Sequence, residues 1–193
     1  AFKPPFLLVH DDGNSQDTLQ ARINGYLQLN GNKYPAQAIH RIDYETSGLV
    51  LFCKHPFFQA YCDKNMEEHH IKKDYIALVQ GHTNYKNKKI VSNIARDRHN
   101  AKKMIIHPNG KESISIFNTL KNYKDYSLIQ VTILTGRKHQ IRVQCASLNH
   151  PILNDSLYGG KRIDNTGLLL QSHHIQFNDI DITCPQEKRF IRK

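Results

Sequence analysis

Residues 40–53 read His40-Arg41-Ile42-Asp43-Tyr44-Glu45-Thr46-Ser47-Gly48-Leu49-Val50-Leu51-Phe52-Cys53. Three ionisable side chains stand directly before a Thr-Ser-Gly turn and an apolar run that we expect to be buried. A carboxylate at such a junction costs free energy unless a cation or hydrogen-bond donors meet it. Because chains accept that cost mainly at functional sites, Asp43 is a candidate functional residue. From these residues alone, a cap or turn role for Asp43 remains the commoner alternative.

This stretch resembles the catalytic motif of the RluA-type pseudouridine synthases, His-Arg-Leu-Asp followed by Thr-Ser-Gly. Four further blocks resemble segments of that family in the same order: Lys3-Pro4 to His10, Lys73 to Gly81, Thr135 to Val143, and His150 to Gly159. The block Thr135-Gly136-Arg137-Lys138-His139-Gln140-Ile141-Arg142 matches almost letter for letter. Any one block is weak evidence, whereas five in order, extending to about Phe177, are strong evidence.

Periodicity predicts the secondary structure. Helical spacing, caps and breakers indicate helices over 17–29 (with Asp17 and Gln20 as a capping box), 55–68 and 138–148. Apolar or alternating runs indicate strands over 49–53, 75–79, 128–134 and 168–177. Many strands and few helices predict an α+β domain with a mixed, largely antiparallel central sheet flanked by helices.

The chain is predicted to be one domain, 1–193, since it shows no repeat, low-complexity tract or linker. It starts directly at the Lys-Pro block. The family resemblance implies a preceding strand or an upstream N-terminal segment, such as a small RNA-binding domain.

Charge points to a polyanionic partner. The chain has 27 Lys and Arg against 17 Asp and Glu, a net charge of +10. Basic residues are concentrated between Thr83 and Glu112, and we expect 86–111 to form a mobile, RNA-gripping insertion outside the pocket. Without the resemblance, a basic but unspecific solvated surface is an equally good interpretation.

Other classes of site are disfavoured. Cys53, Cys62, Cys145 and Cys184 are widely spaced, so we expect no disulfide framework or zinc site, with Cys53 and Cys145 in the core. The twelve histidines suggest RNA contacts or surface positions rather than metal ligands. No apolar run is long enough to span a bilayer and no signal-peptide pattern opens the chain, so the expected location is cytoplasmic.

The resemblance implies the chemistry: isomerisation of a uridine in structured RNA to pseudouridine, without cofactor or metal. Asp43 would be the catalytic carboxylate, as nucleophile or base; Arg142 would pair with it, and Tyr75 would stack on the uracil and move a proton at C5. Leu170 would pack against the base and Arg41 would fill the gap left by the flipped nucleotide. The expected RNA-binding residues are Arg41, Lys102, Lys103, Arg137, Lys138 and His139.

Without the resemblance, Tyr75 fits a core tyrosine and Arg142 fits a surface cation on an amphipathic helix whose polar face it shares with Lys138 and His139. Ribosomal RNA is favoured over transfer RNA as substrate, and the protein is expected to act as a monomer with no obligate protein partner. The runner-up hypothesis is a catalytically silent RNA-binding relative or RNA chaperone. A hydrolase is disfavoured, because the sequence shows neither a second well-placed carboxylate nor a nucleophilic serine elbow.

Overall fold

The structure is a computed structural model that describes residues 1–13 and 15–191. The strands are β1 (Phe2–Lys3), β2 (Gln37–Ala38), β3 (Ser47–Leu49), β4 (Phe52–Cys53), β5 (Lys72–Gln80), β6 (Lys88–Arg96), β7 (Met104–Ile106), β8 (Lys111–Asn122), β9 (Tyr126–Ile133), β10 (Leu170–Phe177) and β11 (Ile180–Thr183). The α-helices are α1 (Leu19–Leu29), α2 (Gln59–Glu67) and α3 (Gln140–Ser147), and short 3-10 turns are η1 (Pro56–Phe58), η2 (Ser156–Tyr158) and η3 (Lys188–Phe190).

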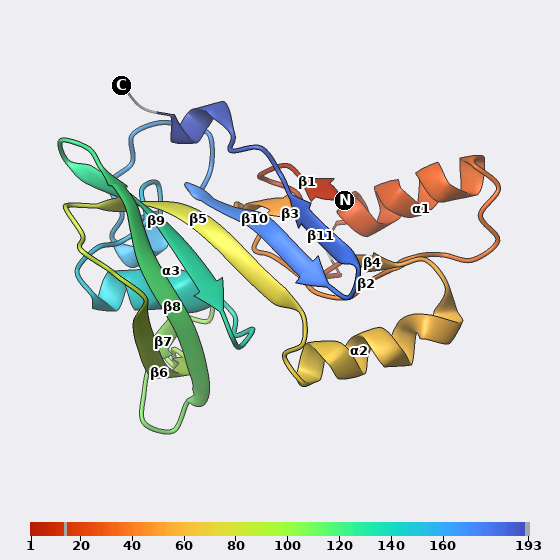
Figure 1. The fold of residues 1–193 in the computed structure, drawn as a ribbon, viewed down its shortest axis with the longest axis horizontal. Helices are drawn as coiled ribbons and strands as arrows, with labels where there is room; N and C mark the ends of the chain where they lie inside the picture. Colours follow the sequence, from red (N-terminus) through yellow and green to blue (C-terminus); the bar gives the residue numbers. More distant parts are fainter. Residues whose placement is uncertain (14, 192–193) are drawn as a thin grey trace.

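One large sheet organises the described part of the chain. Its strand order is β1-β3-β10-β5-β9-β8-β6-β7, with β11 also paired to β10, and β2 and β4 form a separate ribbon. The β3–β10 pairing is parallel and the other pairings of the large sheet are antiparallel. Figure 1 shows α1 and α2 beyond the β10 side of the sheet and α3 on the β6–β9 side. The predicted α+β class with a mixed, largely antiparallel sheet is confirmed.

The core follows from the apolar pattern of the central strands. Ala77, Leu78 and Val79 of β5 are fully buried between β10 and β9. In β9, Ile129 and Val131 are fully buried while Gln130 and Thr132 are half-buried, as the predicted alternation requires. Residues of β5, β9 and β10 also line the main cavity of the described structure.

Gly48 shows why the Thr-Ser-Gly element needs a glycine. Its φ is +112°, and a Cβ atom there would lie 2.1 Å from the backbone oxygen of Ser172 on β10. Any side chain would force β3 and β10 apart, so the glycine permits the one parallel pairing of the sheet. The turn predicted at Thr46-Ser47-Gly48 lies earlier in the chain. It is formed by Tyr44 and Glu45, and Ser47 already belongs to β3.

Three element predictions need correction. The cap of α1 is Thr18, whose Oγ1 accepts a hydrogen bond from the Ala21 amide at 3.1 Å, whereas Asp17 pairs with Arg22. The predicted strand 49–53 is divided between β3 and β4, which belong to different sheets. The basic stretch 86–111 is not an irregular insertion: β6 and β7 continue the main sheet, because β6 pairs with β8 and β7 pairs with β6, which satisfies their backbone groups.

All four cysteines are buried free thiols, which confirms the core placement of Cys53 and Cys145. Within residues 1–13 and 15–191, no group of three or more His, Cys, Asp or Glu side chains is arranged to hold a metal ion. No helix in the same residues is long and apolar enough to cross a membrane.

Candidate active site

A cavity of about 550 Å³ opens on one face of the sheet and brings the sequence motifs together. Its walls come from the segment before β3, the end of α2, strand β5, the turn into α3, α3 itself and the start of β10. Of the predicted site residues, Asp43, Tyr75, Arg142, Leu170, Arg41, Arg137, Lys138 and His139 line it. Lys102 and Lys103 do not; they lie in the loop between β6 and β7.

Asp43 and Arg142 face one another across this cavity. Arg142 Nη1 lies 3.4 Å from Asp43 Oδ2. The predicted proximity is confirmed, although the two residues are 99 positions apart in the chain. The Asp43 side chain keeps 24% of its surface exposed and Arg142 only 6%. The carboxylate is therefore open to a ligand while the guanidinium behind it is not.

Arg142 is held chiefly by Asp155. Its Nε and Nη2 donate to the two Asp155 carboxylate oxygens, both at 2.8 Å, and the Asp155 side chain is fully buried. Burial disfavours the charged guanidinium, but the hydrogen bonds and charge of Asp155, together with Asp43, outweigh this and raise the pKa of Arg142. Arg142 therefore stays a fixed cation. The alternative interpretation of Arg142 as a surface cation on an amphipathic helix is wrong, because its side chain is only 6% exposed.

Tyr158 completes the support of the guanidinium. Its ring lies 5.0 Å from Arg142 Cζ, a cation–π contact, and its hydroxyl accepts a hydrogen bond from the Met104 amide at 2.8 Å. The same hydroxyl lies 2.9 Å from His139 Nδ1. Tyr158 thus links η2, α3 and β7, and Lys103 Nζ lies over its outer face, 5.5 Å from the centroid.

His139 marks the turn into α3. Its φ is +55°, in the left-handed region that costs a non-glycine residue roughly 1–3 kcal/mol. Gln140 locks the turn, accepting from the Arg137 amide at 3.0 Å and donating to Ser115 Oγ at 2.8 Å. Helix α3 therefore starts at Gln140, two residues later than predicted. Lys138 and His139 precede the helix, so they do not share a polar helix face with Arg142, which corrects the prediction.

Burial lowers the pKa of His139 to about 4, with the charge of Asp43 opposing and Arg142 reinforcing the shift. The imidazole is therefore neutral near pH 7. Its Nε2 is 3.9 Å from Asp43 Oδ2, so the contact carries no full ionic attraction at that pH. The standing charge opposite Asp43 comes from Arg142.

Tyr75 and Leu170 form the apolar wall of the cavity. Both are buried, at 6% and 4% exposure, and both come from the central strands β5 and β10. Burial, only partly offset by the Ser172 hydroxyl, raises the pKa of Tyr75 well above its ordinary value. Tyr75 is therefore a neutral phenol near pH 7, with a planar face suited to stacking.

Sequence reasoning missed the roles of Asp155, Tyr158 and Gln140. All three belong to the matched blocks but had been given no function. A signal did exist for Asp155, because a carboxylate beside the apolar residues Ile152 and Leu153 requires a cation when buried. The sequence did not show which cation this was.

Comparison with known proteins identifies the family of this chain. Residues 2–147 match a family model described as RNA pseudouridylate synthase. The chain belongs to the RNA pseudouridylate synthase family. Among its relatives, the uncharacterized RNA pseudouridine synthase YhcT of Bacillus subtilis is 36% identical over 161 residues, covering 82% of this chain and 53% of that protein. The ribosomal large subunit pseudouridine synthase C of Buchnera aphidicola is 39% identical over 175 residues, covering 82% and 55%.

The solved structure of human RNA pseudouridylate synthase domain containing 4 has the same fold, with a TM-score of 0.79 at 18% identity, covering 98% of this chain and 85% of that one. The chain spans about half the length of these two curated relatives. In this member of the pseudouridylate synthase family, the exposed cations Arg41, Arg137 and Lys138 lie at the margin of the cavity.

Proposed function

We propose that this protein converts a uridine in structured RNA to pseudouridine at the Asp43 cavity, with ribosomal RNA as the preferred substrate. The observation that carries the proposal is the open Asp43 carboxylate facing the fixed Arg142 cation beside the Tyr75 and Leu170 wall. Family membership supports the reaction class. Two relatives named as ribosomal large subunit enzymes support the choice of RNA.

The reaction balances without any co-reactant. The bond between ribose C1′ and uracil N1 breaks, the base turns, and a bond forms between C1′ and C5. The proton on C5 leaves and N1 gains one, so the product is an isomer. Such chemistry needs a charged carboxylate at the sugar, a cation to maintain it and a surface that holds the detached base.

Each need has a candidate among the described residues. Asp43 would act on the ribose, as nucleophile or base, with Arg142 stabilising its charged form. Tyr75 and Leu170 would hold the uracil between an aromatic face and an aliphatic side chain. Because the cavity lies below the surface, the target nucleotide must leave its stack, which is least costly in loops and bulges.

The surface cations would supply affinity without reading sequence. We propose this role for Arg41, Arg137 and Lys138 at the cavity, and for Lys102 and Lys103 on the β6–β7 loop. His139, which is neutral near pH 7, would contact the RNA as a hydrogen-bonding group. We also propose that the protein acts in the cytoplasm as a monomer, with RNA as its partner, because its net charge of +10 favours a polyanion.

The test is direct. Total RNA from a strain that lacks the protein is incubated with wild type or with Asp43→Asn, and new pseudouridines are mapped by carbodiimide adducts. New sites in ribosomal RNA with wild type only are the expected result. Sites confined to transfer or messenger RNA would overturn the substrate assignment. RNA binding without any new site would instead favour a silent RNA-binding relative.

A further inference from the structure

Lys73 is a buried cation of the cavity that none of the roles above uses. It lies on β5, two residues before Tyr75, so both side chains point to the same face of the sheet and line the same cavity. Its side chain belongs to the buried set, at 7% exposure. Its neighbour Lys72 points to the opposite face, where its Nζ lies 3.6 Å from Asp74 Oδ2.

The Lys73 ammonium is poorly satisfied. Among the described residues, its one hydrogen bond goes to Met66 Sδ at 3.0 Å, and a thioether is a weak acceptor. No carboxylate among residues 1–13 and 15–191 lies within 4 Å of it. An ammonium has three donors, and a buried charge without partners costs several kcal/mol.

The second buried lysine provides an internal comparison. Lys3 is fully buried, and its Nζ donates to the backbone oxygens of Pro4, Leu7 and Tyr44 at 2.7–3.1 Å. Its three donors are therefore all used within the protein. Lys73, in contrast, lines an open cavity and has one weak acceptor among the described residues, which indicates that its partner is a ligand.

The surroundings specify an anionic ligand. Burial lowers the pKa of Lys73 to about 8, so the group is still mostly protonated near pH 7. Glu67, at the end of α2, also lines the cavity. Two residues along a strand span about 7 Å, which is comparable with the separation of base and phosphate in one nucleotide. With Tyr75 at the base and Asp43 at the ribose, the phosphate is the remaining part of the nucleotide.

We propose that Lys73 binds a non-bridging oxygen of a phosphate adjacent to the flipped uridine, so that the cavity selects a nucleotide within a strand over a free nucleoside. The proposal rests on the function proposed above. Lys73 would differ in kind from the surface cations. Its desolvated ammonium would contact one defined phosphate, whereas exposed lysines neutralise the RNA backbone collectively.

The test uses a short oligoadenylate with one central uridine, together with versions that carry a neutral methylphosphonate at the linkage before or after the uridine. Binding to wild type, Lys73→Met and Lys72→Met is measured by fluorescence anisotropy. Methionine keeps the length and apolar stem of Lys73, and Lys72→Met removes the same charge from the opposite face. Thermal unfolding checks the fold, and removal of an unpaired buried charge is expected to leave the melting temperature equal or higher.

Charge-assisted hydrogen bonds contribute about 1.5–3 kcal/mol, so Lys73→Met should weaken binding by roughly ten-fold or more. Lys72→Met should change it far less. One of the two neutral linkages should weaken wild type as strongly as Lys73→Met does, and should add nothing in that variant. Equal effects of both neutral linkages in wild type and Lys73→Met would overturn the proposal, as would unchanged binding by Lys73→Met.

The measurements on wild type with neutral linkages do not depend on the folding of any variant. Failure of the proposed activity is also distinguishable. If Lys73 is coupled to one linkage but no pseudouridine is mapped, the phosphate site stands and the proposed reaction is rejected. If pseudouridines are mapped but no coupling is found, the reaction stands and the phosphate site is rejected.

Discussion

Arg142 donates from Nε and Nη2 to both carboxylate oxygens of Asp155 at 2.8 Å, and this fork fixes the third nitrogen, Nη1, opposite Asp43. One arginine therefore connects a fully buried carboxylate to a partly open one. The two aspartates should respond differently to substitution, because only Asp155 depends on the arginine for its burial.

Asp43→Asn should abolish isomerisation while leaving RNA affinity and stability near wild type. The amide keeps the shape but supplies neither nucleophile nor base, and affinity comes mainly from phosphate contacts. Turnover is measured by mapping pseudouridine, affinity by anisotropy and stability by urea unfolding. Near-wild-type turnover would remove Asp43 from the mechanism.

Asp155→Leu should destabilise the fold by about 3–5 kcal/mol, because it leaves the buried Arg142 charge without its main partner. Arg142→Met should cost a similar amount and abolish activity as well. The double variant, Arg142→Met with Asp155→Leu, should recover much of the stability but none of the activity. Urea midpoints and slopes of the four proteins form the cycle. Additive destabilisation would contradict the fork described here.

Tyr75→Phe should keep RNA affinity within about two-fold, because the stacking surface is retained, but should slow turnover if the hydroxyl moves the C5 proton. Tyr75→Leu should weaken binding as well, since it removes the aromatic face. Single-turnover rates and binding constants are measured separately for both variants. Unchanged turnover by Tyr75→Phe would leave stacking as the sole role of Tyr75.

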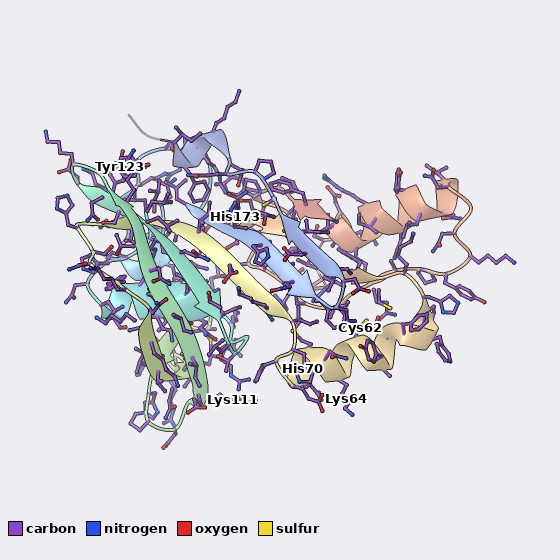
Figure 2. The ribbon with its side chains drawn as sticks, viewed as in Figure 1. Cys62, Lys64, His70, Lys111, Tyr123 and His173 are labelled. Atoms are coloured by element: carbon purple, nitrogen blue, oxygen red, sulfur yellow. The ribbon has the colours of Figure 1, made fainter. Side chains whose placement is uncertain are left out.

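Replacing Lys102 and Lys103 together by alanine should weaken binding to all RNA sequences alike and lower the salt dependence of log Kd by about two charges. The matched control replaces Lys121 and Lys124, which flank Tyr123. Figure 2 shows Tyr123 and Lys111 at opposite ends of β8. A shift in which uridine is modified, at unchanged affinity, would contradict the electrostatic role.

Stability should fall in acid through His40. Burial, with the charge of Lys73, lowers its pKa to about 3 from 6.5, and its Nε2 accepts from the Leu51 amide at 3.2 Å. Below pH 6.5, His40 binds a proton in the unfolded chain but stays neutral in the folded chain. This contribution to stability is therefore present above pH 6.5 and lost as the pH falls toward 3, by about 1.4 kcal/mol per pH unit.

His40→Gln, which keeps an acceptor without titrating, should show a smaller loss of stability than wild type between about pH 6.5 and pH 4. Urea unfolding across that range provides the comparison. The difference between the two proteins isolates His40 from the other groups that titrate there. Parallel curves for wild type and variant would show that His40 does not contribute.

The sequence determined what depends on neighbours in the chain. Alternation in 128–134 and the continuous apolar run of 75–79 predicted β9 and β5, and the Pro56 start predicted the turn into α2. The motif blocks determined the family and most cavity residues, because each block carries its chemistry within a few consecutive positions.

Only the tertiary structure decided the partners. Whether Arg142 is a surface cation or a buried clamp depends on Asp155, 13 positions away, and on Asp43, 99 positions away. Gly48 is required by a strand more than a hundred residues later. Lys72 and Lys73 are identical in type and adjacent, yet one is exposed and paired and the other buried beside the cavity. Periodicity assigns them to opposite faces, but the burial of each face, and with it the free energy of each charge, is set by elements distant in the chain.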